Sequence, residues 1–481
     1  MRVRTTHEGA RLVLRLTPRG REPRGSSPHM VARSVTFDPV PTDAVHPDLV
    51  ALVALLCVHP WQDGRLEMDR PVSQVFAAAA QCGLGIEVGP VDPAVEPRPC
   101  PQGGPVALAY SGGVDCTAAL EVLGPTAHAY YQQRHRFDDQ PLGGKIDPAA
   151  ALAAVAFIAD QGIATRVVRT DVEFLRDPMG FPHDLQNAAP ALLWAGHDGT
   201  SALSWGTVLT SATMLGATAY RPYEQSPFVA EFGPVFQAVG LPVANVVAGV
   251  SEVGTAVIAA RSPYGPPAAS CQRGEPGRPC MRCWKCGRKT LSTLGVTDQW
   301  PPGAELDRFL QQEEIARNLR RRPIKVEVAL AWAAARYAAS STADHESRVM
   351  AALHDLTRGN DATPLEASFT PALDPLPARL RPGVEESLAR HLAPMSPEQE
   401  QWVRDWTLES HGSRPGRDAA RARLAEALDP VTNPVGGEDF DPTTITPREP
   451  RRQPDTDDHP GVRARLGSRV AARWPFSRSG R

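Results

Sequence analysis

The sequence has no apolar run that approaches the length of a membrane span and no strong excess of charge of either sign. Its formal net charge is −3 at pH 7, so the overall charge gives no reason to expect binding to nucleic acid or to an acidic surface. The first 34 residues lack the apolar segment of a secretory signal. We therefore expect a cytoplasmic protein that binds no membrane.

Lysine is rare among the 51 basic residues, and no internal repeat is present. Arginine, alanine and proline are abundant instead, which is typical of a GC-rich bacterial coding sequence, so arginine clusters carry less functional weight than usual. With 481 residues, the chain is long enough for two or three domains and a sizeable core. Hydrophobic residues make up 42% of it, as in a globular protein.

Cysteine is sparse as well, but four of the eight cysteines lie close together. Cys271, Cys280, Cys283 and Cys286 form a C-x8-C-x2-C-x2-C array. In a reducing cytosol this spacing indicates a metal site before a disulfide framework. Four thiolates suit a closed tetrahedral zinc site, which would hold a loop with little core of its own. An iron–sulfur cluster and two reducible disulfides are the alternatives.

The stretch VALAYSGGVDCTAALEVLG, which begins at Val106, combines three local signals. Its first five residues are apolar without alternation, which favours a strand buried on both faces of a parallel sheet. The apolar residues then recur at helical spacing, and Asp115 and Thr117 suit a helix start. Between strand and helix, Gly112 and Gly113 let backbone N–H groups approach a phosphate at the helix N-terminus. An ordinary tight turn is the alternative, but it needs only one glycine.

Strands and helices alternate from the glycine turn onward. Strands are expected over residues 127–132, 164–170, 201–206 and 242–248, and helices over 148–160, 184–196, 228–239 and 252–260. This alternation predicts an α/β fold, with a mostly parallel sheet, helices on both faces and a ligand site at the carboxyl ends of the strands.

The remaining segments suggest further divisions of the chain. We expect residues 1–34 to be disordered, with Met30 as an alternative start of the protein. An appended α/β domain is expected at 35–100, and a second α/β domain, which contains the cysteine knuckle (271–286), at 101–296. A helical accessory domain should follow at 300–430 and a disordered tail at 431–481. The tail is rich in Pro, Gly, Asp and Arg and has little periodicity.

The segment SGGVDC closely resembles the SGGxDS signature of the PP-loop ATP pyrophosphatases, a group of adenine nucleotide alpha hydrolase-like proteins. The resemblance implies a Rossmann-like (HUP-type) sheet and cleavage of ATP between its α- and β-phosphates. It places the nucleotide on Ser111, Gly112, Gly113, Val114, Asp115 and Cys116. It gives catalytic roles to Ser111 and Asp115, with Asp115 organising the loop or Mg²⁺.

Cys116 stands where that family usually has serine. A thiol at a helix N-terminus can have a lowered pKa and become reactive. The favoured alternative is a small residue that fills a serine-sized site.

The spacing from the glycine turn to the cysteines resembles the 7-cyano-7-deazaguanine synthase family within that group. Asn187 in LQN lies where the family has an Arg-Asn pair, SCQRGE resembles its Ser-Cys-Tyr-x-Gly stretch, and GVSEVGTAVIAAR resembles its Leu-Ser-Lys segment, with Glu252 in place of the lysine. The resemblance covers residues 106–293. It implies that ATP activates a carboxylate as an acyl-adenylate, that ammonia captures it, and that a second ATP drives dehydration of the amide to a nitrile.

The implied ligands are ATP, Mg²⁺, Zn²⁺ and a carboxylate-bearing small molecule or peptide, while the amine donor stays open and a homodimer is allowed. The long extensions on both sides of the matching region leave the substrate open too. Five further residues lie where adenine or substrate could reach: Arg134, His135, Arg136, His183 and Asp184.

Two other functions remain open at this point. One is a tRNA-modifying PP-loop enzyme of the thiolation or lysine-adding type, although the weak basic balance speaks against it and Cys116 would be its only plausible sulfur carrier. The other is a catalytically silent nucleotide-binding protein, which the intact Ser-Gly-Gly-x-Asp core speaks against.

Overall fold

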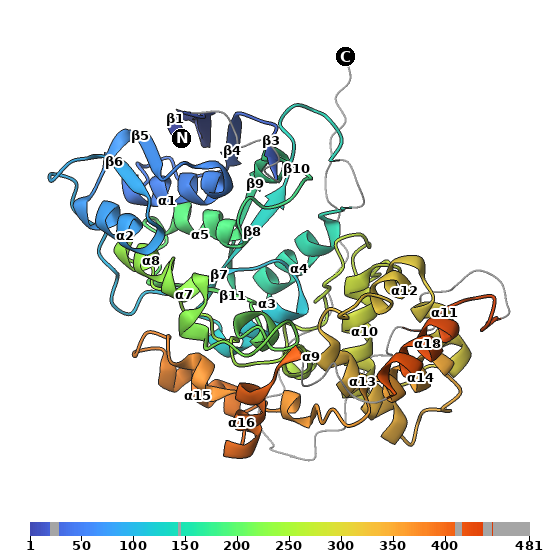
Figure 1. The fold of residues 1–481 in the computed structure, drawn as a ribbon. Coiled ribbons are helices and arrows are strands. Elements are labelled where there is room, and N and C mark those ends of the chain that lie inside the picture. The colour runs from blue at the N-terminus through green and yellow to red at the C-terminus, as the bar shows by residue number, and fades with distance from the viewer. Residues whose placement is uncertain (20–27, 143–145, 409–415, 436–444, 446–481) are drawn as a thin grey trace, which may run out of the picture. The chain divides into compact units, whose positions relative to one another are not determined.

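A mixed β-sheet of nine strands organises the N-terminal half of the chain (Figure 1). The computed structural model describes residues 1–19, 28–142, 146–408, 416–435 and 445. The strands are β1 (Arg2–Glu8), β2 (Arg11–Thr17), β4 (Ser34–Asp38), β5 (Arg65–Val72), β6 (Glu87–Val91), β7 (Val106–Ala109), β8 (His128–Arg134), β9 (Ala164–Thr170) and β11 (Ala202–Trp205). Their order in the sheet is β11-β7-β8-β9-β4-β2-β1-β5-β6. The short strands β3 (His29–Met30) and β10 (Arg176–Asp177) form a separate pair.

Strands β11, β7, β8 and β9 form a parallel block and confirm four strands expected from the sequence. The chain leaves β7 towards β8 and β9 and later returns to the other side of β7 at β11. The crevice beyond the carboxyl ends of β7 and β11 is therefore a topological switch point, where open α/β sheets bind ligands.

The strand expected over residues 242–248 is absent from the described residues except for one parallel bridge between Leu203 and Val243. The Leu203 amide donates to the Pro242 carbonyl (3.0 Å) and the Ala244 amide donates to the Leu203 carbonyl (2.7 Å). Most residues of this segment are buried. A short apolar run cannot by itself distinguish a strand from buried irregular chain.

The N-terminal residues contradict the predicted disorder of residues 1–34. Strands β1 and β2 form an antiparallel hairpin, and β4, which pairs with both β2 and β9, joins this hairpin to the parallel block. The alternation in β2 buries Leu12, Leu14 and Leu16 while the residues between them point the other way. The many arginines concealed this two-residue period. The strands on both sides of residue 100 thus belong to one sheet, and residues 20–27 lie outside the described part of the chain.

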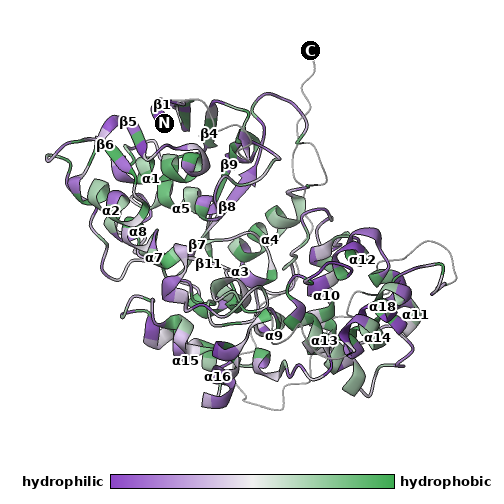
Figure 2. Cartoon of the chain, in the orientation of Figure 1, coloured by the Kyte–Doolittle hydropathy of each residue, from purple (hydrophilic) through white to green (hydrophobic). Residues whose placement is uncertain are grey.

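Helices cover both faces of the parallel block, as expected. They are α1 (Pro47–Val58), α2 (Gln74–Leu84), α3 (Val114–Leu123), α4 (Ala149–Asp160), α5 (Ala189–Trp194), α6 (Leu209–Ala212), α7 (Pro227–Ala230), α8 (Gly233–Ala238) and α9 (Glu252–Arg261). In β7, Ala107 and Ala109 pack in the core shared with α1, α5 and α8, whereas Val106 and Leu108 pack in the core shared with α3, α4 and α9. In Figure 2 the hydrophobic colour is prominent on α1 and α5.

Two of the expected helices differ from the prediction. The helix expected over residues 184–196 begins as a 3-10 turn, Asp184–Ala188, before α5. The helix expected over 228–239 is divided into α7 and α8. Pro234 lies in the first turn of α8, and because proline lacks an N–H group it starts a helix more readily than it continues one.

The C-terminal part of the described chain is helical, as predicted for residues 300–430. Its helices are α10 (Trp284–Thr297), α11 (Gly303–Leu310), α12 (Glu313–Leu319), α13 (Glu327–Ala339), α14 (Arg348–Thr357), α15 (Arg381–Ala389), α16 (Pro397–Asp405) and α18 (Arg417–Ala427). Buried Asp307 accepts hydrogen bonds from the Ser347 hydroxyl (2.5 Å) and the Asn433 amide (2.9 Å). Most of the tail predicted to be disordered, 436–444 and 446–481, lies outside the described residues. None of the described helices has both the length and the apolar character that crossing a bilayer requires.

The half-buried His183 and His59 form a ring cluster with the buried Phe232. The two imidazole centroids lie 4.9 Å apart, and His183 lies 4.5 Å from the Phe232 ring. Burial lowers the pKa of His183 to about 4, and burial also lowers the pKa of His59. Both imidazoles are therefore neutral in the folded protein at neutral pH.

We expect the folded state to lose stability as the pH falls from about 6.5 to about 4. In this window the unfolded chain binds a proton at its ordinary histidine pKa while folded His183 does not, so protonation favours unfolding. The substitution His183→Phe should remove up to about 3 kcal/mol of this pH dependence. Urea unfolding of both proteins across the window measures it, and equal slopes would contradict the assignment.

Candidate active site

A cavity of about 320 Å³ opens beyond the carboxyl ends of β7, β8 and β11. Its size lies within the range of small-molecule sites. One side is lined by the glycine turn after β7 (Ser111, Gly113, Asp115, Cys116), by Gly206 and Thr207 after β11, by residues 269–272, and by Lys285, Arg288 and Lys289 of α10. The cavity thus lies at the switch point of the parallel block.

The two glycines of the turn have different structural roles. Gly112 has a φ of 72°, and a Cβ there would lie 3.0 Å from the Ala154 Cβ and 3.1 Å from the Ala151 Cα of α4. Gly113 has an extended backbone and is the N-cap of α3. A Cβ on Gly113 would instead face the cavity-lining hydroxyls of Ser111 (3.4 Å) and Ser270 (3.6 Å). Gly112 is therefore required by the turn, whereas a Cβ on Gly113 would make only ordinary contacts beside the cavity.

Asp115 and Thr117 were expected to suit a helix start, and α3 does begin beside them, at Val114. Gly113 caps it without a side-chain hydrogen bond, and Asp115 lies in the first turn. Thr117 is buried, with its hydroxyl 3.2 Å from the Tyr110 hydroxyl. The uncapped end leaves backbone N–H groups at the edge of the cavity. One of them, that of Val114, donates to the Ser270 Oγ (3.4 Å).

Gly206 permits the closest approach of β11 to this turn. A Cβ on Gly206 would lie 2.8 Å from the Cys116 nitrogen and 2.9 Å from the Asp115 carbonyl carbon, both closer than a side-chain carbon normally comes. No motif marks this glycine. Its position directly after an apolar strand is the one sequence signal that could have identified it.

Cys116 is a buried, hydrogen-bonded thiol. Its Sγ accepts from the Ser111 amide (3.3 Å) and donates to the Gly113 carbonyl (3.1 Å). Burial raises the pKa of the Cys116 thiol, although hydrogen bonds from Ser111 oppose the effect. The thiol therefore stays protonated at neutral pH, as expected of a residue that fills a serine-sized space and not of an activated nucleophile.

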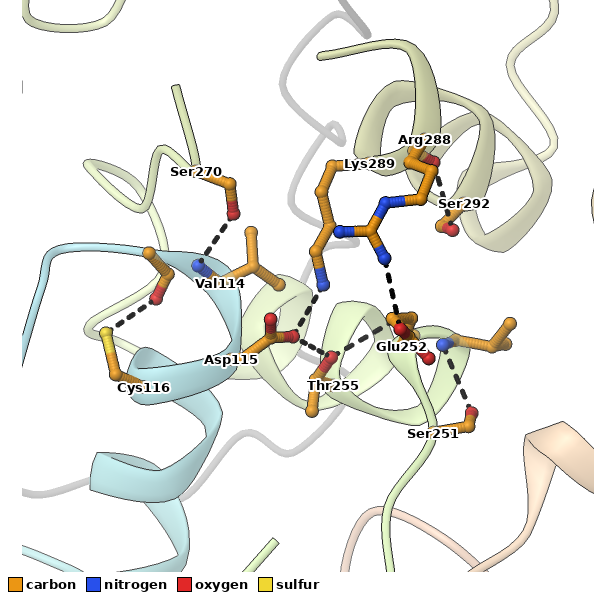
Figure 3. Close-up of polar contacts among 12 residues, drawn as sticks. Val114, Asp115, Cys116, Ser251, Glu252, Thr255, Ser270, Arg288, Lys289 and Ser292 are labelled. Atoms are coloured by element: carbon orange, nitrogen blue, oxygen red, sulfur yellow. Dashed lines mark hydrogen bonds and ion pairs between the residues drawn. The ribbon is translucent and has the colours of Figure 1, made fainter. Parts of the chain in front are cut away.

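Asp115 forms an ion pair with a lysine that lies 174 positions away in the sequence (Figure 3). Its Oδ1 accepts from the Lys289 Nζ (2.5 Å) and from the Thr255 hydroxyl (2.7 Å). Burial disfavours the ionised carboxyl, but the Lys289 ammonium and the hydrogen bonds outweigh burial and lower the pKa of Asp115. Asp115 is therefore a carboxylate at neutral pH.

A second ion pair lies beside the first. The Arg288 Nη1 donates to the Glu252 Oε1 (3.1 Å), which also accepts from the Thr210 hydroxyl (2.8 Å). Glu252 begins α9, and the Thr255 hydroxyl also contacts the Glu252 carbonyl (3.1 Å), so both pairs are fixed to α9 (Figure 3). The basic partners of both ion pairs thus come from α10.

Lys285, Arg288 and Lys289 were not among the residues expected from the sequence. They lie at positions i, i+3 and i+4, which place side chains on the same side of a helix. A usable signal was present, because the sequence contains four lysines and two of them occur in WKCGRKT, directly beside the cysteine array.

The four cysteines come together as predicted. Their Sγ atoms all lie within 4.8 Å of one another, with 3.5 Å between Cys283 and Cys286 and 3.9 Å between Cys280 and Cys286. A tetrahedron with metal–sulfur distances of about 2.3 Å has sulfurs about 3.8 Å apart. All four are free thiols, so this cluster could hold a metal such as zinc.

The cysteine cluster connects two walls of the cavity. Cys271 directly follows Ser270, whose hydroxyl meets the glycine turn, and the preceding Ala269 amide donates to the Gly112 carbonyl (2.9 Å). Cys283 caps α10 through the Cys286 amide (3.4 Å), and the basic residues of the cavity follow in the same helix. A metal held by these thiols would fix the two walls relative to each other.

The other residues expected near substrate divide into two groups. Arg134 and Asn187 line the cavity. His135, Arg136, His183 and Asp184 are not among its lining residues; Arg136 pairs with Asp138 (2.5 Å).

Residues 231–407 match a family described as a family of unknown function (DUF6395). The matched segment includes the four cysteines and α10 but begins after the glycine turn. No curated protein and no solved structure matches the chain.

Proposed function

We propose that the protein cleaves ATP between the α- and β-phosphates to activate a carboxylate as an acyl-adenylate, which an amine then captures as an amide. One observation carries this proposal. A glycine turn at the start of a helix and three basic side chains of another helix line one cavity at the switch point of a parallel sheet. The reaction type is similar to that of the 7-cyano-7-deazaguanine synthases.

The glycine turn and α10 suit a pyrophosphate leaving group. The N-terminus of α3 presents backbone N–H groups and partial positive charge to an anion. Lys289 and Arg288 add N–H donors that their carboxylate partners hold in place, and Lys285, which has no ion-pair partner among the described residues, adds a positive charge. Such groups lower the barrier most where charge develops, which is on the departing pyrophosphate.

Asp115 fits the role of a ligand for Mg²⁺. Both Lys289 and Thr255 contact its Oδ1, its side chain is 28% exposed, and it lines the cavity, so Oδ2 suits a hard cation. When bound, Mg²⁺ would neutralise phosphate charge. Asp115 also orients Lys289 towards the same end of the cavity.

The buried thiol favours this reaction over thiolation. A sulfur carrier must be accessible and readily ionised, whereas Cys116 is buried, hydrogen-bonded and has a raised pKa. The four cysteines of the cluster are the donor set of a structural zinc site. We accordingly assign zinc to the cluster and ATP with Mg²⁺ to the cavity.

The test is incubation of the purified protein with ATP, Mg²⁺, ammonium and a panel of carboxylates. We expect AMP and pyrophosphate to form when the right acid is present. If the acid carries ¹⁸O in its carboxylate, one ¹⁸O should appear in AMP, because the mixed anhydride leaves that oxygen on the nucleotide when the amide forms. Release of ADP and phosphate would reject the proposal.

Asp115→Asn should reduce the rate of AMP formation by roughly 100-fold and weaken ATP binding much less, because a charged ligand matters most as the leaving group develops charge. Initial rates and calorimetric ATP binding separate the two effects.

In the Cys116→Ser protein the rate of AMP formation should stay within about twofold of the wild-type rate, since a hydroxyl can replace the thiol in its hydrogen bonds. An inactive Cys116→Ser protein would give the thiol a catalytic role.

A further inference from the structure

The cavity has a second end, at the carboxyl end of β8, that the proposed ATP chemistry does not use. The glycine turn and α10 contribute the basic end, whereas this end contains Gln132, Arg134, Glu173 and Asn187. Strand β8 neighbours β7 on the side away from β11. The second end therefore lies one strand along from the glycine turn.

Arg134 is a buried guanidinium with unused hydrogen-bonding capacity. Its Nη2 forms an ion pair with Glu173, and the two side chains are only 11% and 9% exposed. Its Nε and Nη1 are buried without a hydrogen-bond partner among the described residues. Buried donors without partners are costly, and here they belong to a side chain that lines the cavity.

Gln132 lies two residues before Arg134 in β8, so both side chains emerge on the same face of the strand. The Gln132 amide donates to the Gln186 Oε1 (2.8 Å), and the Gln132 Oε1 is buried without a partner in the described structure. The same face of β8 therefore offers unused donors on Arg134 and an unused acceptor on Gln132.

We propose that this end of the cavity binds the second reactant through an uncharged planar group that carries a carbonyl beside an N–H, such as a primary amide or a lactam. The carbonyl accepts from Arg134 and the N–H donates to Gln132. Glu173 already neutralises the guanidinium, so a second carboxylate at this place would be left without a counter-charge. This assignment rests on the proposed function, because it assumes that the second reactant binds in this cavity.

The test uses matched pairs of small probes, nicotinamide with nicotinate and benzamide with benzoate, bound to the full-length protein without ATP and followed by ligand-observed NMR. We expect each amide to bind at least tenfold more tightly than its carboxylate. Glu173→Gln leaves the guanidinium charge unpaired and should reverse this preference. Equal or tighter carboxylate binding in the wild type, or no binding of either pair, would overturn the proposal.

A double variant, Arg134→Gln with Glu173→Gln, removes the donors without leaving a buried charge. It should fold and lose at least tenfold in amide affinity. The matched control is Arg417→Gln with Glu327→Gln, which removes an ion pair of similar burial (2.5 Å) between α18 and α13 and should leave probe binding unchanged. Amide binding that persists in the double variant at Arg134 refutes the proposal.

ATP cleavage is measured separately from these binding experiments. Amide selectivity without formation of AMP would retain the site and reject the proposed reaction. Formation of AMP without amide selectivity would do the opposite.

Discussion

Gly113→Ala should reduce AMP formation at least 100-fold while the protein remains folded, an effect of the size expected when a phosphate is displaced from its donors. The added methyl group meets only the Ser111 and Ser270 hydroxyls, at 3.4 and 3.6 Å, so the backbone has no reason to move. It does occupy the space in which a phosphate would approach the N-terminus of α3. Thermal unfolding, ATP binding and AMP formation measured on the same preparation test this separation.

The neighbouring glycine supplies the contrasting variant. Gly112→Ala forces a side chain into a φ of 72° and against α4, so it should lower the free energy of unfolding by about 1–3 kcal/mol. Gly124, at the other end of α3, has a φ of 75° and no atom within reach of a Cβ. Gly124→Ala should cost about 1 kcal/mol and leave activity intact. A Gly113→Ala protein that cleaves ATP normally would reduce the stretch to an ordinary turn.

In the parallel block, β7 and β11 could be predicted because they are buried on both faces and are short apolar runs. The same reasoning failed at residues 242–248, where a buried apolar segment forms only one bridge. It also failed at β1 and β2, where arginines on one face of each strand resembled a solvated terminus. At residues 242–248 the local composition gave the burial of the segment but not its hydrogen-bond partners, and at β1 and β2 it gave neither.

The candidate site was predicted where its residues are adjacent in sequence, and missed where the fold brings them together. The glycine turn and the cysteine spacing are local, so each could be read directly. The contact between Asp115 and Lys289 joins positions 174 apart, and no periodicity connects them. The same is true of Arg134 and Glu173. They meet because the 3-10 helix Val172–Leu175, which contains Glu173, follows β9, and β9 lies next to β8 in the sheet.

Cys286→Ser should abolish metal binding, lower the free energy of unfolding by several kcal/mol and eliminate ATP binding. The four thiols lie in one core cluster with side chains of the C-terminal helices. Loss of the metal would therefore leave the remaining thiols buried with no metal to bind. The start of α10 would then lose its attachment to residues 269–272, and Lys289 its position against Asp115. Metal analysis should find one zinc per chain in the wild type and none in the variant.

Cys82→Ser is the matched control, because Cys82 is an exposed free cysteine in α2, and it should change neither metal content nor stability. Chelation of the wild type should reproduce the Cys286→Ser phenotype, and added zinc should reverse it. If metal analysis found iron instead of zinc, the cluster would have to be assigned as an iron–sulfur centre. A metal-free protein that remained fully folded and still bound ATP would show that the cluster does not hold the two walls of the cavity together, since the hydrogen bonds of Ala269 and Ser270 to the glycine turn would then suffice.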